Sequence, residues 1–272
     1  MSISKPPFGI KPNYAHPQMK GLIGWWLFNE GSGGQAYDSS LNRNTGELKN
    51  MAFPPIATSG WGAGRNGEKG LKFDGTNDYV DVGDSSILRF TSGNFSLSAW
   101  TYVKSTSQQM FLFHGKGGVA WGSWFLSIGG NETEPQPGKY AFGFGTASGP
   151  TNRNVYSIGS ATTGSWVYLT AVYDGSNLYL YKNGVLDNSA AGTGNPWNNT
   201  VNTIIGGDPA GTPRDILNGS IDDVRIYNRA LSAEEIKQLY EDPYGMFNGS
   251  KLVLSDLIGA PVVANGGFFQ FM

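Results

Sequence analysis

Oxygen-bearing side chains gather in one short segment, at a spacing that could bind a calcium ion. Residues 38–44, Asp-Ser-Ser-Leu-Asn-Arg-Asn, offer carboxylate, hydroxyl and amide oxygens. Calcium takes about six to eight oxygen ligands, commonly from flexible loops. We therefore expect Asp38, Asn42 and Asn44 to bind calcium as a structural cofactor. A second cluster of the same kind lies at Asp74, Asn77 and Asp78. The alternative is that these residues only stabilise turns, where Asp and Asn are common.

Tryptophans in glycine-rich connections are candidates for a sugar-binding site. An indole ring can stack on the apolar face of a sugar, while neighbouring amides bind its hydroxyl groups. Trp197 combines both features because asparagines flank it on each side. The residues that we expect to bind a glycan are Trp197, Asn195, Asn198, Asn199, Trp121 and Trp124. The alternative is that these rings close loops onto the core, since single apolar residues near a surface are ordinary.

The elements that would position these side chains are almost all strands. Trp166–Tyr173 alternates in the pattern of a strand. Asn183-Gly184 supplies the pair of positive φ angles that a type I′ hairpin requires. Together these signals predict a three-stranded meander from Trp166 to Ala190. Other predicted strands are Leu71–Phe73, Tyr79–Val82, Phe95–Val103, Lys139–Phe144, Thr203–Ile205 and Ile221–Tyr227, whereas residues 50–70 are expected to form a loop.

One short helix is predicted near the C-terminus, at Ser232–Tyr240. Ser232 and Glu235 have the spacing of a capping box. Pro243 would stop the helix because its ring cannot continue the hydrogen-bond pattern. An apolar stripe that could pack against a sheet is formed by Ile236, Leu239 and Tyr240.

Five blocks of the chain resemble the laminin G-like branch of the concanavalin A-like jelly rolls. In the order of that family they are Gly21–Ser40, Gly70–Gly83, Phe95–Val103, Gly164–Leu186 and Asn218–Tyr240. The resemblance implies an all-β fold, a sandwich of two antiparallel sheets with one short C-terminal helix. In such sandwiches the last strand often returns beside the first. This would bring Asp222 to the calcium site at Asp38.

The resemblance divides the chain into three parts. Residues 1–20 contain four prolines and form an extended arm, residues 21–247 form the jelly-roll domain, and residues 248–272 form a tail. The tail is unusually apolar for a terminus. We expect it to be an assembly element that adds to the sheet edge or groove of a neighbouring molecule. Its candidate contact residues are Phe268, Phe269 and Phe271.

The sequence argues against catalysis. Enzymes that resemble this fold carry clustered acids on one strand, because glycoside hydrolysis needs two positioned carboxyl groups. No Glu-x-Asp pattern occurs in the chain, nor does a Gly-x-Ser-x-Gly motif. The two histidines, His16 and His114, have no partner at the spacing of a zinc site. We therefore expect a non-catalytic protein.

Composition narrows the function further. The net charge is −2 and no basic run occurs, so nucleic acid is not an expected partner. No apolar run is long enough to insert into a membrane, and the chain has no cysteine. The first residues lack the apolar segment of a secretory signal. Such a chain stays in the cytoplasm, leaves the cell by another route or is assembled into a particle that leaves. The resemblance of the whole layout to phage proteins implies the last of these: a protein made in a host cytoplasm and built into a virion, with an extracellular location as the alternative.

The layout of arm, single domain and apolar tail resembles stand-alone proteins of phage and environmental virus genomes. It implies a recognition or structural module on the particle surface: a capsid decoration, a head fibre or a tail-associated protein. Its expected partners are capsid or tail proteins, a cell-surface glycan and further copies of itself. The alternatives are a purely structural decoration protein without a ligand and a free carbohydrate-binding lectin.

Overall fold

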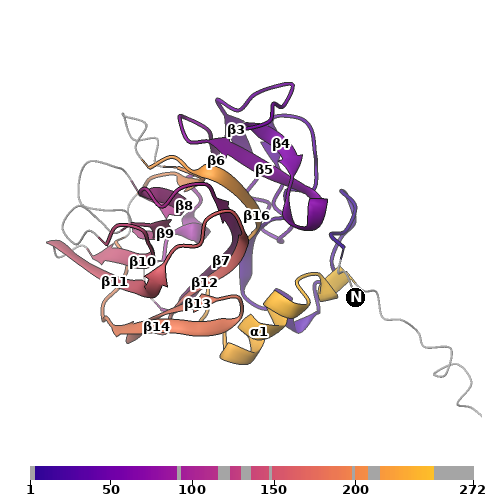
Figure 1. Ribbon diagram of the computed structural model, residues 1–272. Coiled ribbons are helices and arrows are strands. Elements are labelled where there is room, and N and C mark those ends of the chain that lie inside the picture. The colour runs from indigo at the N-terminus through magenta and orange to yellow at the C-terminus, as the bar shows by residue number, and fades with distance from the viewer. Residues whose placement is uncertain are drawn as a thin grey trace, which may run out of the picture.

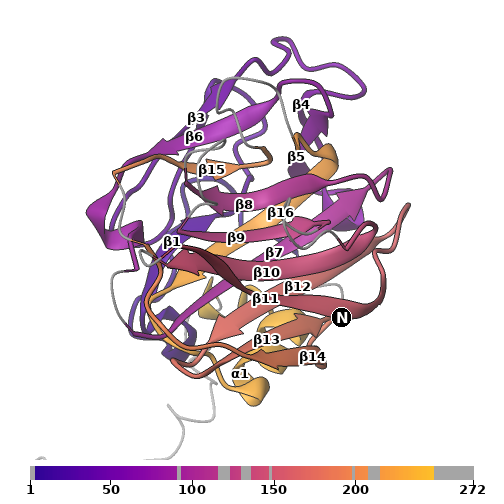
Figure 2. The ribbon, with the colours of Figure 1, turned by 90° about the vertical axis from the view of Figure 1, so that its left-hand side faces the viewer.

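The protein is a sandwich of two antiparallel β-sheets, which confirms the predicted fold class (Figures 1 and 2). The computed structural model describes residues 4–90, 93–115, 123–129, 136–146, 149–197, 200–207 and 215–247. Each sheet contains eight strands. No helix in these residues is both long and apolar enough to cross a bilayer.

The first sheet has the strand order β14-β13-β12-β7-β16-β5-β4, and β1 pairs with β16 beside this path. All its pairings are antiparallel. Its strands are β1 (Leu22–Trp26), β4 (Gly60–Ala63), β5 (Lys69–Asp74), β7 (Phe95–Val103), β12 (Trp166–Tyr173), β13 (Asn177–Lys182), β14 (Val185–Ala191) and β16 (Asn218–Tyr227).

The second sheet, seen face on in Figure 2, has the order β11-β10-β9-β8-β15-β6-β3-β2. Its pairings are antiparallel as well. Its strands are β2 (Gln35–Ala36), β3 (Gly46–Lys49), β6 (Tyr79–Gly83), β8 (Gln109–His114), β9 (Trp124–Ile128), β10 (Lys139–Thr146), β11 (Gly149–Ser160) and β15 (Thr203–Ile205).

Several predicted strands agree with the structure residue by residue. β7, β12 and β15 have the predicted bounds. The hairpin turn between β13 and β14 has positive φ at both Asn183 and Gly184, as its type I′ sequence requires. The predicted loop at residues 50–70 is corrected, because it contains β4 and a short 3-10 helix, η2 (Arg65–Gly67). The other 3-10 helices are η1 (Pro17–Met19), η3 (Ser86–Leu88) and η4 (Gly245–Phe247).

The single α-helix among the described residues, α1 (Ala233–Glu241), agrees with the predicted Ser232–Tyr240 to within one residue at each end. The Ser232 hydroxyl accepts a hydrogen bond from the backbone N–H of Glu235 at 3.3 Å. The Glu235 carboxylate accepts one from the backbone N–H of Ser232 at 2.9 Å, which completes the capping box. α1, yellow in Figure 1, lies on the outer side of the first sheet beside β14.

Two large apolar cores result from this arrangement, and a third, small cluster is formed by Met110, Phe113, Phe125 and Ala141 of the second sheet. The larger one fills the space between the sheets and includes Trp26. The smaller one lies under α1 and includes Trp25, Ile236 and Leu239. Adjacent residues of a strand point to opposite faces, so Trp25 and Trp26 enter different cores. Both rings are fully buried.

Candidate functional site

An irregularity in the central strand β16 places two consecutive aspartates in different surroundings. On one side β16 pairs with β7, and the register shifts between Asp222 and Arg225. On the other side its first half pairs with β5 and its second half with β1. Asp223 has a φ of 49°, in the left-handed region that non-glycine residues seldom adopt. The irregularity therefore coincides with the junction between β1 and β5.

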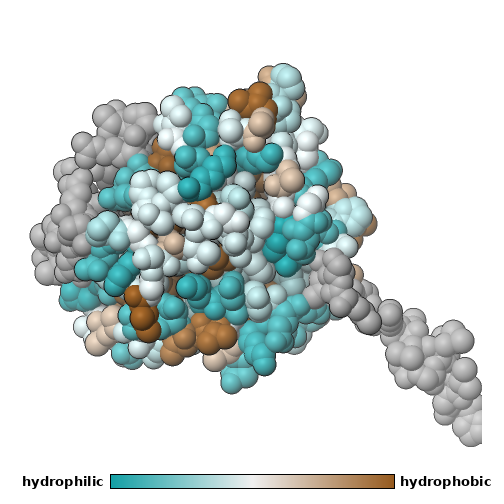
Figure 3. All heavy atoms as spheres, viewed as in Figure 1, coloured by the Kyte–Doolittle hydropathy of each residue, from teal (hydrophilic) through white to brown (hydrophobic). Residues whose placement is uncertain are grey.

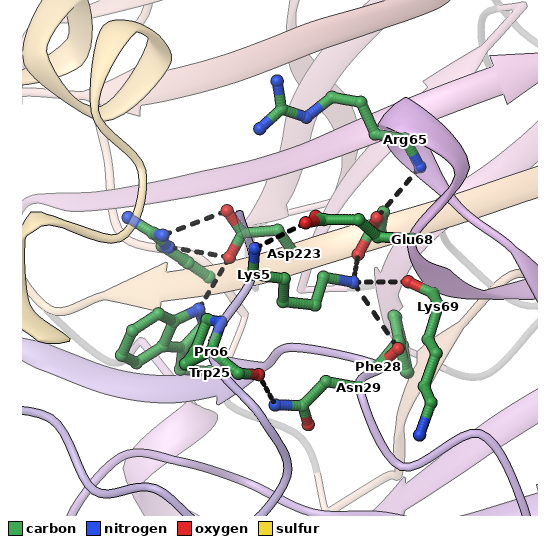
Figure 4. Close-up of polar contacts among 11 residues, drawn as sticks. Lys5, Pro6, Trp25, Phe28, Asn29, Arg65, Glu68, Lys69 and Asp223 are labelled. Atoms are coloured by element: carbon green, nitrogen blue, oxygen red, sulfur yellow. Dashed lines mark hydrogen bonds and ion pairs between the residues drawn. The ribbon is translucent and has the colours of Figure 1, made fainter. Parts of the chain in front are cut away.

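Lys5 of the N-terminal arm fills this junction. Its ammonium group contacts the Asp222 carboxylate and donates to the backbone oxygen of Lys69 at 2.6 Å (Figure 4). A third oxygen, that of Phe28 at the end of β1, lies 3.5 Å away. The Lys5 and Asp222 side chains are only 3% and 1% exposed. A carboxylate and two carbonyl oxygens are acceptors for the three N–H donors of an ammonium group, so the charge is matched although it is buried.

Further hydrogen bonds hold the arm against the domain. The Lys5 backbone N–H donates to the Glu68 carboxylate at 2.8 Å. The Asn29 amide donates to the Pro6 oxygen at 2.8 Å, as Figure 4 shows. Farther along, the backbone N–H of Asn13 donates to the oxygen of Met246 at 2.8 Å. The predicted arm thus binds its own domain from residue 5 onward.

Asp222 is the titratable group most affected by this burial. Desolvation raises the pKa of its carboxyl group to about 6, although Lys5 and the backbone N–H of Arg65 lower it. The Arg65 N–H lies 3.2 Å from the second carboxylate oxygen. Gly64 lies so close that a Cβ atom there would meet the same oxygen at 2.6 Å. The carboxylate is therefore enclosed on all sides that the structure describes.

Asp223 belongs to a second network, on the α1 side of the sheet. It accepts hydrogen bonds from the Arg225 guanidinium at 3.0 Å and from the Trp25 indole N–H at 2.7 Å. Arg225 also donates to the backbone oxygen of Pro243, just after α1. The guanidinium lies 4.6 Å from the centre of the Trp25 ring. Since both charged side chains are fully buried, this network positions the helix and is closed to ligands.

The polar groups of the predicted calcium ligands already form hydrogen bonds within the protein. Asp38 accepts hydrogen bonds from five donors at 2.7–3.2 Å: the N–H groups of Trp25, Ser40 and Asn44, the Ser40 hydroxyl and the Asn44 amide. The Asn42 and Asn44 amides both donate to the Ile23 oxygen at 3.0 Å.

Asp222 is paired with Lys5 and does not join the Asp38 contacts. No group of three or more His, Cys, Asp or Glu residues in the described part of the chain is placed to hold a metal. In this arrangement the residues do not fit a calcium ion. Calcium binding stays a prediction, and these contacts weigh against it.

A groove separates the arm from the loop that carries Asp38. Its volume is about 450 Å³. The rings of Phe8 and Tyr37 both line it and pack against each other, with their centres 5.5 Å apart, and these side chains are 54% and 45% exposed. Glu30 lies in the wall, where one carboxylate oxygen accepts the backbone N–H of Tyr37 at 2.7 Å. Burial raises the pKa of Glu30. The wall also includes Lys11, Tyr14, Leu41 and Arg43.

The tryptophans expected to bind a glycan lie apart from this groove. Trp197 is half-buried beside exposed Asn195, and its backbone N–H donates to Gly145 at 2.8 Å. Trp124 is fully buried, with its indole N–H bonded to Leu88 at 3.0 Å and its ring stacked on His114. This burial argues against Trp124 as a stacking residue. Trp121, Asn198 and Asn199 lie outside the described residues, as do Phe268, Phe269 and Phe271.

Sequence patterns gave no indication of the groove residues Phe8, Tyr37 and Arg43. The sequence predicts the arm as a separate extension, and contacts between an arm and a loop leave no periodic pattern in the sequence. The one available clue was an aromatic residue, Phe8, directly after Pro6-Pro7, where proline restricts the backbone.

Comparison with known families agrees with the fold. The family model of the concanavalin A-like lectin/glucanases superfamily matches residues 74–237, more than half of the chain. The chain belongs to this superfamily. No curated protein matches it. Members of one fold have many unrelated functions, so membership alone does not identify a ligand.

Solved structures of binding domains share the fold of this superfamily member. Domain 4 of AbnA, an extracellular arabinanase from Geobacillus stearothermophilus, was solved with arabinotriose. It is 17% identical, the match covers 80% of this chain and 98% of that one, and the TM-score is 0.60.

Two toxin domains also match. The binding domain of Paraclostridial Mosquitocidal Protein 1 is 16% identical with a TM-score of 0.59, over 81% of this chain and 52% of that one. The receptor binding domain of botulinum neurotoxin D is 16% identical with a TM-score of 0.57, and the match covers 82% of this chain and 53% of that one. This chain therefore spans about half the length of both toxin domains, and the likeness is one of fold.

Proposed function

We propose that this protein is a non-catalytic carbohydrate-recognition module that binds a glycan in the groove between its arm and residues 37–45. The observation that carries the proposal is the exposed pair of adjoining rings, Phe8 and Tyr37, that lines a groove of 450 Å³. Aromatic faces pair with the apolar faces of sugar rings. The volume lies within the range of about 300–1,000 Å³ of small-molecule sites.

Polar groups in the groove suit the hydroxyl groups of a sugar. Sugars need donors and acceptors beside the aromatic platform, and Glu30, Lys11 and Arg43 provide both. The arabinotriose complex of the matching arabinanase domain is a precedent for a sugar ligand on this fold. The receptor-binding role of the matching toxin domain supports recognition in the same way.

The groove carboxylates support binding without hydrolysis. A glycosidase needs one carboxyl group as acid and another as base or nucleophile, about 5–10 Å apart and open to the substrate. Asp38 accepts five hydrogen bonds from its own loop and from β1. Glu30 alone does not form a catalytic pair. We therefore expect no reducing sugar to be released from any bound polysaccharide.

A glycan microarray followed by titration calorimetry tests the proposal. Phe8→Ala and Tyr37→Ala should each weaken binding about tenfold, given the usual contribution of an aromatic contact. Val185→Ala, at a position 69% exposed on β14, is the matched control and should change nothing. Trp197→Ala tests the alternative site. If only Trp197→Ala loses binding, the glycan binds at the loop of Asn195 and not in the groove. If the wild type binds no glycan on the array, the proposed function is wrong.

We also propose that this recognition takes place on a virus particle. The support is the layout of arm, domain and apolar tail, which suits a protein anchored by its tail and displaying its domain. Mass spectrometry of purified particles should detect the chain. Deletion of residues 248–272 should abolish its incorporation while the isolated domain keeps its melting temperature. Incorporation without any glycan binding would favour a purely structural decoration protein, and absence from particles would favour a free lectin.

A further inference from the structure

Two cationic side chains of the groove are free to meet a ligand. Lys11 on the arm and Arg43 on the opposite loop both line the groove, and both are exposed. Within the described residues, neither side chain takes part in a hydrogen bond or an ion pair. Two nearby cations are used internally: Lys5 pairs with Asp222, and the Lys69 ammonium donates to the backbone oxygen of Glu30 at 3.1 Å.

The carboxylates of the groove are, by contrast, less exposed. The five donors around Asp38 surround its charge with N–H and O–H dipoles. Glu30 accepts the backbone N–H of Tyr37 with one oxygen, and its other oxygen is buried without a hydrogen-bond partner. The exposed charged groups that line the groove are therefore the two cations, although the whole chain has a net charge of −2.

The backbone at Arg43 gives a second reason to assign a role to its side chain. Its φ of 54° lies in the left-handed region, which glycine and asparagine adopt at a lower cost. Strained backbone conformations of this kind cluster at functional sites. The side chain makes no hydrogen bond or ion pair within the described residues, so no such interaction explains its conformation.

From these observations we propose that the groove selects an acidic saccharide. A pyranose ring stacks on the aromatic surface that Phe8 and Tyr37 form together, and its carboxylate lies against the Arg43 guanidinium with Lys11 nearby. A guanidinium matches a carboxylate because it can donate two parallel hydrogen bonds. The inference rests on the proposed function, since it identifies the ligand class of the same groove. Uronic acids and sialic acids share the required chemistry.

Matched pairs of saccharides test this inference with the full-length chain. Oligogalacturonate is compared with its methyl ester, and 3′-sialyllactose with lactose, by titration calorimetry. Wild-type protein should bind the acidic member of one pair at least about tenfold more tightly, the usual effect of a hydrogen bond to a charged group. The pair that shows the preference identifies the source. The preference should shrink with added salt, because exposed charges are screened.

Two variants complete the experiment. Arg43→Asn should erase the preference and keep the melting temperature, because asparagine tolerates a positive φ. Lys104→Met removes one exposed charge outside the groove and should leave the preference intact. Equal binding of acidic and neutral sugars, or a preference that survives Arg43→Asn, overturns the inference and leaves the proposed function standing. If the chain binds no saccharide at all, both are wrong.

Discussion

Lys5 and Asp222 are 217 residues apart in the chain, and their charged groups are in contact in the interior. The contact closes the junction at which β16 changes its neighbour from β5 to β1. It also fixes the start of the arm, three residues before the Phe8 ring of the groove. The ion pair thus supports both the sandwich and the proposed binding site.

Loss of the Lys5 ammonium should destabilise the fold. Lys5→Met leaves the Asp222 carboxylate buried without its cation, which typically costs about 3–5 kcal/mol when one partner of a buried pair is removed. Protonation of Asp222 will reduce the loss, so we expect about 2–4 kcal/mol at neutral pH, measured by urea unfolding. The double variant Lys5→Met/Asp222→Asn should recover part of it.

The matched control for this pair is an exposed one. Lys49 and Glu47 lie 2.7 Å apart at the surface. Lys49→Met should change the free energy of unfolding by less than about 0.5 kcal/mol, as exposed pairs usually do. An equal effect of both substitutions would contradict the special role of Lys5.

Stability should depend on pH through Asp222. Burial raises the pKa of this group from 3.8 to about 6, so the folded state binds a proton more tightly than the unfolded chain does. Its contribution is then fully present below about pH 4 and is lost as the pH rises to about 6. The size is on the order of 3 kcal/mol, since each pKa unit corresponds to about 1.4 kcal/mol.

Asp222→Asn isolates this contribution from those of other groups. Burial also raises the pKa of Glu30 and Asp78, whereas the Arg229 guanidinium lowers that of Glu235. From pH 4 to pH 7 the wild type should lose stability relative to Asp222→Asn. A wild type that instead gains stability over this range would show that the ionised pair with Lys5 is net favourable, against this expectation.

Asp38 should stabilise its loop without calcium. Asp38→Ala removes the acceptor for three backbone N–H groups, and buried donors without partners cost about 1–3 kcal/mol each. We expect a loss of about 3 kcal/mol or more, the same in calcium and in chelator. Asp84→Ala, which removes a partly exposed pair with Arg89, is the control. If calcium raises the melting temperature of the wild type but not of Asp38→Ala, the loop binds the ion after all.

The capping box of α1 should contribute measurably. Ser232→Ala removes the hydroxyl that accepts the Glu235 N–H, and such caps contribute about 1 kcal/mol. Lys237→Ala, on the exposed side of the same helix, should stay within about 0.5 kcal/mol of wild type. Equal unfolding free energies of Ser232→Ala and wild type would show that packing alone holds the helix.

Most of the sandwich could be predicted because its signals are local. Alternation along Trp166–Tyr173 and the Asn183-Gly184 turn lie within single elements, and their structure follows from a few neighbouring residues. β4 was missed because a strand of Gly60-Trp61-Gly62-Ala63 has little strand propensity of its own. Its pairing with β5 and the burial of Trp61 outweigh that deficit.

The site was predicted less well because it depends on contacts between distant segments. Nothing near Lys5 indicates that it pairs with Asp222. Two adjacent acids in a buried strand were nevertheless a visible conflict, since buried carboxylates need partners. That conflict could have indicated a hidden cation, although not which one. Asp38 was singled out as a calcium ligand, whereas the partners that the structure gives it include N–H donors of its own loop.

The pairing of β1 with β16 also sets the order of events while the protein is made. On the ribosome, β1 is synthesised among the first strands, and its partner in the sheet is synthesised among the last of them. Lys5 likewise is synthesised long before its partner Asp222. Contacts of such sequence separation form slowly because long loops must first be closed. The first sheet is therefore complete only when translation of the domain is nearly finished. Until then β1 lacks its partner strand in that sheet, so its apolar residues are open to contact with chaperones.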